Sequence, residues 1–212
     1  MFGDAQNGKN QPAMPKPSNI EIVFVCTLNE FYNGANKVVK YKREKLRHDA
    51  KSTEIVEETL QVQVKPGFSE ETVLELKEQG NESLGHPRSS VFIKFKQAPH
   101  SNFKRIKGND LIYTHKISLV DSLKGDPVVF QHFDGRTVSV GIDSLISPQS
   151  VKIVRGEGMP VHKENADSEV QVLGLERMEK GDLYIRFEIE FPTELREEQK
   201  SQLLEVLKGE RS

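Results

Sequence analysis

Internal repetition is the feature that most limits what this chain can fold into. Three segments of the first half recur in the same order in the second half: 28–34 as 119–125, 60–80 as 138–158, and 91–96 as 183–188. The first pair, LNEFYNG and LVDSLKG, shares Leu at the first position, an acid at the third and Gly at the seventh. Two copies of about 90 residues are too few for a solenoid, so the repetition predicts two similar domains in tandem.

The number of residues that separates matching positions of the two copies, which we call the offset, changes along the chain. It falls at the second matching pair and recovers at the third. The first copy should therefore have a longer loop after its second strand. The second copy should carry an insertion near residues 161–178.

Apolar residues alternate with polar ones through most of the chain after residue 19, which is the period of a half-buried β-strand. Clear examples are Ile20, Ile22 and Phe24; Leu60, Val62 and Val64; and Leu183, Ile185, Phe187 and Ile189. The pattern predicts a mainly β protein, with two tandem small β-sandwich domains followed by a C-terminal helix. The expected divisions are a flexible leader at 1–19, a first β domain at 20–108, a second at 109–192, and the helix within 193–212.

The expected C-terminal helix begins after Pro192, with Thr193 as its N-cap. Its apolar stripe consists of Leu195, Leu203, Leu204 and Leu207. About 15 residues form a marginal helix in water, so this stripe must be buried against another surface. A second subunit and the second domain are both candidates for that surface.

The composition narrows the classes of partner and compartment. The net charge is −2, which provides no overall field for nucleic acid or for a membrane. No stretch approaches the roughly 20 apolar residues of a membrane span, and the leader lacks the regions of a signal peptide. The single cysteine excludes an internal disulfide. Cytosol or nucleus is therefore the expected location.

The sequence offers no pattern of catalytic, metal-binding or cofactor-binding residues. The six histidines lack the spacing of metal ligands, and Cys26 reads as a small buried hydrophobe within a strand. NFKRIK at 102–107 has one ring and three cations, which is a weak pattern for single-stranded RNA. We expect a protein that is not an enzyme and binds neither a cofactor nor nucleic acid.

Eight motifs in order resemble the C-terminal region of DnaJ (J-domain) co-chaperones. They are LxExxxG, VKPG, QGNE, HSNFKRIKGNDLIY, DGRTVSV, GEGMP, GDLYIRFEIEFP and EEQKSQLLEVL, between about residues 20 and 208. The cysteine repeats of type I members are absent, so the chain is similar to type II members. His-Pro-Asp, the mark of a J domain, is also absent: the only His-Pro, at 86–87, is followed by Arg88.

This resemblance implies a homodimeric module that holds clients and works with a DnaK-type chaperone. In the family, a shallow apolar groove on the first domain takes extended segments of unfolded client proteins. The matching positions here are Ile22, Phe24, Val39, Tyr41 and, in the connection between the domains, Phe103. Residues two apart on a strand share one face, which agrees with the first four positions. The alternative for each of them is an ordinary core residue.

Lysines beside that groove hold the acidic C-terminal tail of the DnaK-type partner in the family. Lys37 and Lys40 match these lysines, within a stretch from 37 to 51 that has seven Lys and Arg against two acids. The chain departs from the family at a further basic position, where Glu57 or Glu58 stands. The alternative is a solvated hairpin. A dedicated structural scaffold of DnaJ-like architecture is the alternative function, and an RNA-binding β module is a second.

Overall fold

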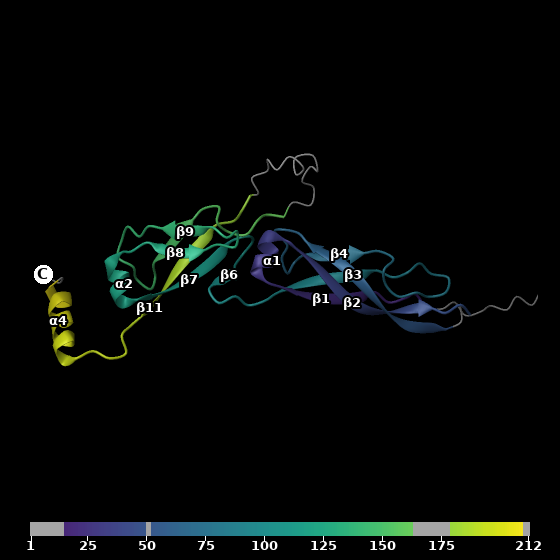
Figure 1. Ribbon diagram of the computed structural model, residues 1–212, viewed down its shortest axis with the longest axis horizontal. Helices are drawn as coiled ribbons and strands as arrows, with labels where there is room; N and C mark the ends of the chain where they lie inside the picture. Colours follow the sequence, from purple (N-terminus) through teal and green to yellow (C-terminus); the bar gives the residue numbers. More distant parts are fainter. Residues whose placement is uncertain (1–14, 50–51, 163–178, 210–212) are drawn as a thin grey trace, which may run out of the picture. The chain divides into compact units, whose positions relative to one another are not determined.

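The structure is a computed structural model that describes residues 15–49, 52–162 and 179–209. It divides into two compact units between Pro99 and His100, which we call the first and the second unit (Figure 1). The sequence had placed this division after residue 108, so the connection 100–108 lies with the second unit instead. Most of the expected leader and insertion, at 1–14 and 163–178, falls outside the described residues.

Strands make up most of the regular structure in each unit, as the alternation predicted. The first unit contains β1 (Ile20–Cys26), α1 (Leu28–Asn33), β2 (Ala35–Leu46), β3 (Thr53–Val64), β4 (Val73–Leu76) and β5 (Val91–Gln97). The second contains β6 (Phe103–Arg105), β7 (Leu111–Ser118), α2 (Leu119–Lys124), β8 (Val128–Gln131), β9 (Thr137–Val140), β10 (Val151–Val154) and β11 (Leu183–Glu190), and α4 (Glu197–Lys208) follows.

The two units share one sheet topology. The first has a sheet of order β1-β5-β4 and a β2-β3 hairpin, and the second has a sheet of order β10-β11-β7-β6 and a β8-β9 hairpin. In both units the strand before the short helix pairs in parallel with the last strand, β1 with β5 and β7 with β11. The duplication read from the sequence is therefore a duplication of fold.

The register of the strands is conserved between the copies as well. Ile20 pairs with Val91 in the first unit, and Leu111 pairs with Leu183 in the second. The hairpins agree in the same way, with Lys37 opposite Val62 and Val128 opposite Val140. Positions in the first unit can therefore be matched to positions in the second residue by residue.

A short helix follows β1 in the first unit and β7 in the second, and each helix ends at the glycine of the repeated motif. Thr27 and Glu30 form a capping box at the start of α1, and the Ser118 side chain caps α2. Gly34 and Gly125 at the helix ends have φ values of 80° and 73°, which L side chains rarely adopt. A Cβ at Gly34 would also lie 3.0 Å from the Val64 oxygen. The backbone therefore requires the shared glycine.

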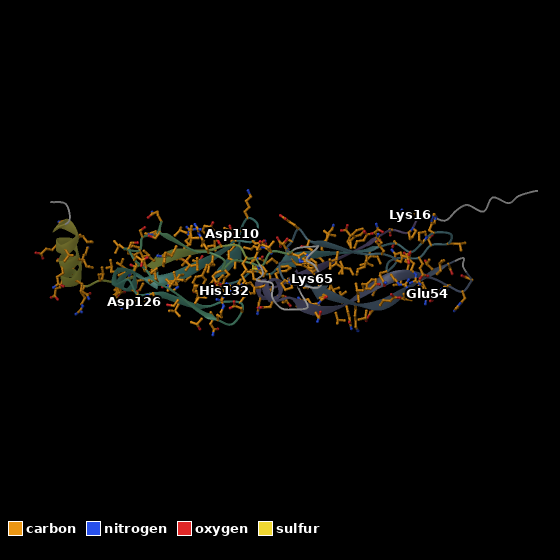
Figure 2. All side chains as sticks on the ribbon, turned by 90° about the horizontal axis from the view of Figure 1, so that it is seen from above. Lys16, Glu54, Lys65, Asp110, Asp126 and His132 are labelled. Carbon is orange, nitrogen blue, oxygen red and sulfur yellow. The ribbon has the colours of Figure 1, made fainter. Side chains whose placement is uncertain are left out.

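The hairpins differ in length, and the sequence had predicted the wrong form for the difference. The additional residues of the first copy are not a loop, because they lengthen the β2-β3 ladder to 12 residues a strand. Glu54 lies on this long hairpin (Figure 2). The strands β8 and β9 have four residues each. The alternation of inward and outward side chains continues past Tyr41, which is why the added residues stay paired.

Each unit has its own apolar core between its sheet and its hairpin. In the first unit Phe95 is at the centre, with the rings of Phe24, Phe31 and Phe68 between 5.5 and 6.2 Å from its ring. Cys26 is fully buried beside this core, as expected of a small hydrophobe. The buried residues of the second core include Leu111, Tyr113, Ile117, Val128, Phe130, Leu183, Ile185 and Phe187.

The C-terminal helix is present but begins later than predicted. Its N-cap is Arg196 rather than Thr193, and the Arg196 backbone N–H donates to the Gln199 side chain at 3.1 Å. This bond fixes the helix start one turn after the threonine, so Leu195 precedes the helix. None of the residues of α4 is buried in the single chain. Among the described residues no helix is long and apolar enough to cross a lipid bilayer.

Candidate functional site

The four predicted groove residues of the first unit lie on two strands, one pair on each. Ile22 and Phe24 share a face of β1, and Val39 and Tyr41 share a face of β2. Phe24 and Tyr41 are buried, at 7% exposure each, whereas Ile22 and Val39 are only half-buried. The alternative of ordinary core thus fits Phe24 and Tyr41 better than the other two.

The Lys37 side chain near the start of β2 reaches the open edge of β1. The sheet order β1-β5-β4 leaves one side of β1 without a strand partner among the described residues. On that side the Lys37 ammonium of β2 donates to the Val25 carbonyl of β1 at 2.8 Å. The open edge of β1, on which half-buried Ile22 lies, therefore has backbone groups that can pair with an extended chain.

The hydroxyl of Tyr41 is held by the protein at the far side of this region. It donates to the Gln79 carbonyl at 2.8 Å and lies 3.4 Å from a carboxylate oxygen of Glu58. Burial raises the pKa of this phenol, and the nearby Glu58 charge raises it further. The Tyr41 side chain is thus held in place by hydrogen bonds, and its phenol stays uncharged near neutral pH.

An ion-pair network that the sequence did not reveal stands next to Tyr41. The Arg43 guanidinium is 4% exposed and reaches Glu58 at 2.6 Å and Glu82 at 2.8 Å. Arg88 also pairs with Glu82, at 2.9 Å, and the Leu46 N–H donates to the Glu82 carboxylate at 3.0 Å. Glu58, noted in the sequence as a departure from a basic position, is therefore the partner of a buried cation.

The network shifts the pKa values of its members in the directions that pairing requires. The hydrogen bond from Arg43 lowers the pKa of the Glu58 carboxyl. Burial alone would raise the pKa of Glu82, but the bonds from Arg43 and the Leu46 N–H outweigh it and the pKa is lowered. The guanidinium and both carboxylates are charged together. Arg43 continues the inward series of Val39 and Tyr41, and that alternation was the signal that could have predicted its burial.

The two predicted tail-binding lysines differ in their surroundings. Lys37 pairs with Glu30 at 2.9 Å in addition to its bond to β1, and its side chain is 24% exposed. Lys40 is 72% exposed and is 3.7 Å from Glu57. Lys40 is therefore the lysine that an acidic ligand can reach without displacing a close partner.

Phe103, the fifth predicted groove residue, is 6% exposed and is packed within the second unit. It is the first residue of β6, which pairs antiparallel with β7. Its ring centroid lies 4.8 Å from those of Tyr113 and Phe133 and 5.9 Å from that of Phe130. These contacts give Phe103 a role in the second core, and its assignment to the groove of the first unit stays a prediction.

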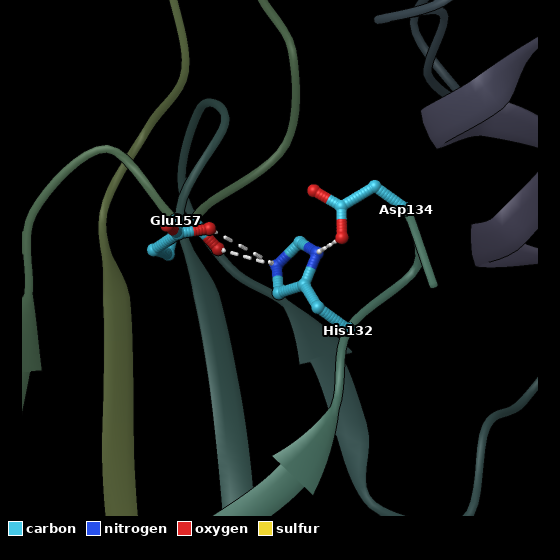
Figure 3. A group of neighbouring side chains, drawn as sticks. All are labelled: His132, Asp134 and Glu157. Carbon is cyan, nitrogen blue, oxygen red and sulfur yellow. Dashed lines mark hydrogen bonds and ion pairs between the residues drawn. The ribbon is translucent and has the colours of Figure 1, made fainter. Parts of the chain in front are cut away.

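One group in the second unit has the donor types of a metal site, although the histidine spacing had not indicated one. His132, Asp134 and Glu157 bring their ligand atoms within 4.8 Å of one another (Figure 3). Arg136, however, bonds Asp134 at 2.8 Å and Glu157 at 2.8 Å. Burial alone would raise the pKa of Asp134, but the bonds from Arg136 and the charge of His132 lower it to about 2.

The same group is best described as an ion-pair network. A guanidinium already bridges the two carboxylates, and Lys180 lies 3.9 Å from Asp134. The His132 ring nitrogen Nε2 lies 3.0 Å from the Glu157 backbone oxygen, which fixes the ring between these acids. A metal ion would have to displace the arginine from both carboxylates.

The predicted dimerisation residues are all exposed in the single chain. Leu203 and Leu204 are 40% and 48% exposed, and Leu207 is 64% exposed. All three lie on α4, whereas Leu195, at 43%, stands just before it. This leaves the apolar stripe uncovered in the single chain, and its burial in a dimer stays a prediction.

Comparisons with known proteins agree on one family. The family model described as "DnaJ C terminal domain" matches residues 20–192. "DnaJ homolog subfamily B member 5" of Homo sapiens is 28% identical over 169 residues, which are 80% of this chain and 45% of that protein. "DnaJ homolog subfamily B member 13" of Homo sapiens is 28% identical over 188 residues, or 89% and 55%.

A yeast protein gives a similar result. "Protein SIS1" of Saccharomyces cerevisiae is 27% identical over 197 residues, which are 92% of this chain and 51% of that protein. The chain therefore spans about half the length of the curated relatives it matches.

Proposed function

The chain belongs to the DnaJ C-terminal domain family, and from this premise we propose that it is a non-enzymatic co-chaperone module for unfolded clients. It holds exposed apolar segments of these proteins in the first unit and presents them to a DnaK-type chaperone. The cytosol or the nucleus stays the expected location.

The observation that carries the proposal is the pair of half-buried aliphatic side chains on β1 and β2. Ile22 and Val39 are neither fully packed nor fully exposed, and Ile22 lies on β1, one edge of which has no strand partner among the described residues. An extended client can pair its backbone with such an edge while its side chains contact the apolar faces. Backbone hydrogen bonds depend little on the sequence of the bound segment, which suits a protein that handles many clients. We call this region, lined by Ile22, Phe24, Val39 and Tyr41, the client groove.

Peptide-array binding tests the client groove. We expect the protein to bind many apolar segments, and Val39→Asp to abolish this binding because it places a charge on the apolar face. Val38→Asp is the matched control, since Val38 is the next residue of β2 and is 63% exposed on the other face. Equal binding by both variants would contradict the groove. Tight binding of a single partner instead of many peptides would favour the dedicated scaffold.

The acidic tail of the partner chaperone is the second proposed ligand, and Lys40 and Lys37 are its proposed contacts. Because Lys37 already pairs with Glu30, an arriving carboxylate must compete with that side chain. Glu30→Gln keeps the reach of the side chain and removes the competing charge. We expect this variant to bind a synthetic acidic tail peptide more tightly in a fluorescence titration, and Lys40→Glu to bind it less well. Unchanged affinity in both would remove these lysines from the proposal.

A second copy of the chain is the proposed cover for the stripe on α4. Exposed leucines at helical spacing support this, since a helix of this length needs packing to persist in water. We expect a dimer by light scattering, and Leu203→Asp or Leu207→Asp should give monomers. Gln202→Asp, on the same helix but on the face opposite the stripe, is the control and should remain dimeric. A monomeric wild-type protein would refute this part.

A further inference from the structure

We propose that strand β6 of the second unit displays the kind of segment that the client groove takes. The ligand is an extended chain antiparallel to β1, with an aromatic residue opposite Ile22 and a basic residue directly after it. This inference rests on the proposed function, because it specifies the ligand of the same groove.

The conserved register supplies the correspondence between the two units. Helices α1 and α2 start at Leu28 and Leu119, and both hairpins keep the same pairing. Counting along the strands from these positions matches the four groove residues Ile22, Phe24, Val39 and Tyr41 with Tyr113, His115, Phe130 and His132. The second unit therefore contains an equivalent of the client groove.

That equivalent site is filled by the chain itself. In β6, Phe103 pairs with Tyr113 of β7, the match of Ile22. The pairing extends backward, since the Thr114 N–H donates to the Asn102 carbonyl at 2.8 Å. The centroid of the Phe103 ring lies 5.9 Å from that of Phe130 and 6.4 Å from that of His132. Phe130 and His132 match Val39 and Tyr41. One aromatic side chain thus touches three of the four equivalent positions.

The matched side chains of the two units differ in their exposure, as expected if the site in the second unit is filled and the site in the first unit is open. Tyr113 and Phe130 are 7% exposed beneath the ring of Phe103. Their matches Ile22 and Val39 are only half-buried, because no described residue of the first unit occupies the position of Phe103. Isoleucine and valine are also smaller than tyrosine and phenylalanine, so the first unit has less side-chain volume at these two of the four matched positions.

The residue after the aromatic one meets a different neighbour in each unit. Lys104 stands opposite Ile112 in the second unit. The match of Ile112 in the first unit is Glu21, whose side chain is 60% exposed and pairs with Lys94 at 2.7 Å. Residues directly opposite in an antiparallel pair lie close enough for their charges to interact. The client groove therefore favours Lys or Arg at this position of the ligand.

The test uses a fluorescent peptide with the sequence of residues 98–107, APHSNFKRIK, added to the full chain and followed by polarisation. We expect it to bind the wild type and Val38→Asp but not Val39→Asp, which places it in the first unit. Replacing Phe by Ala in the peptide should weaken binding about thirtyfold, as for a central aromatic anchor. Replacing Lys by Glu should weaken it about two- to fivefold, and Glu21→Lys should reverse that preference.

Orientation is the sharper readout. A nitroxide at the C-terminus of the peptide should attenuate the amide signal of Ile20 more than that of Phe24, and a nitroxide at the N-terminus should do the opposite. The reversed pattern, or attenuation along β2 and not β1, overturns the inference. If array peptides bind through Val39 while the linker peptide does not, the inference fails and the proposed function stands. If neither binds, both fail.

Discussion

Strand β7 of the second unit is covered along its outer edge by β6, whereas the matching edge of β1 in the first unit meets the Lys37 ammonium of β2. Both edges would otherwise present a row of unpaired N–H and C=O groups, which proteins usually cover or protect with charge. The exposed edge is therefore protected differently in the two copies: a strand covers it in the second unit, and a lysine binds to it in the first. A lysine can move aside more easily than a strand, which supports the proposal that the first unit is the copy that binds a transient ligand.

The hairpins add a second contrast. The long β2-β3 ladder carries a buried guanidinium between two carboxylates, and the shorter β8-β9 region carries an exposed one that bridges Asp134 and Glu157. Charge removal should thus matter more in the first unit. Loss of an aromatic ring should matter more in the second, where Phe103 completes the core.

The largest effect should come from Phe103→Ala. Removing a buried phenylalanine costs about 3–5 kcal/mol of unfolding free energy, and here it should fall on the second unit. Hydrogen exchange should show that the amides of β7 lose protection while those of β1 keep theirs. Phe191→Ala is the control, since this phenylalanine is 67% exposed. Equal loss in β1 and β7 would mean that the two units do not unfold independently.

Arg43→Met should have the next largest effect, and on the other unit. Glu58 and Glu82 would lose their buried counter-ion, which destabilises the first unit by about 3 kcal/mol. Denaturant unfolding together with exchange of the β2 amides measures this change. Lys42→Met is the matched control, because Lys42 is the exposed neighbour on the same strand and should change stability by less than about 0.5 kcal/mol. A destabilised β7 in Arg43→Met would break the comparison.

Acid should produce the smallest of the three effects. Because folding lowers the pKa values of Glu58 and Glu82 below 4.5, their stabilising contribution is complete above that value. It is lost as the pH falls through the lower, folded pKa values. Unfolding free energies measured from neutral pH down to about pH 3 should fall less steeply for Arg43→Met than for the wild type. Parallel curves would show that Arg43 does not set these pKa values.

Much of the fold was accessible from the sequence, because the duplication and the alternation are periodic signals. The matched segments 28–34 and 119–125 contain the equivalent helices, and the fall in offset at the second match corresponds to the longer β2-β3 hairpin. Of the candidate site, the strand positions and shared faces could be predicted. The half-buried state of Ile22 and Val39 could not, since exposure depends on which segments cover a strand.

The features that were missed lack a local pattern. Strand β6 has three residues, too few for an alternation to appear, so its position beside β7 was hidden. Arg43 was counted with its charged neighbours in the sequence, although the strand turns it to the opposite side from Lys42 and Glu44. The start of α4 was misplaced because Thr193 is a good N-cap by type, while the backbone bond to Gln199 fixes the helix one turn later.

The parallel pairing of β1 with β5 also sets an order of events during synthesis on the ribosome. The first strand of the first unit has to wait for the last, since Cys26 pairs with Gln97. Contacts between such distant parts of a chain form slowly, and domains generally fold in turn as they emerge. The boundary at Pro99 follows that last strand almost at once. The nascent first unit can therefore close while much of the second is still being made, so the strands that carry the proposed client groove would be assembled before the second unit is complete.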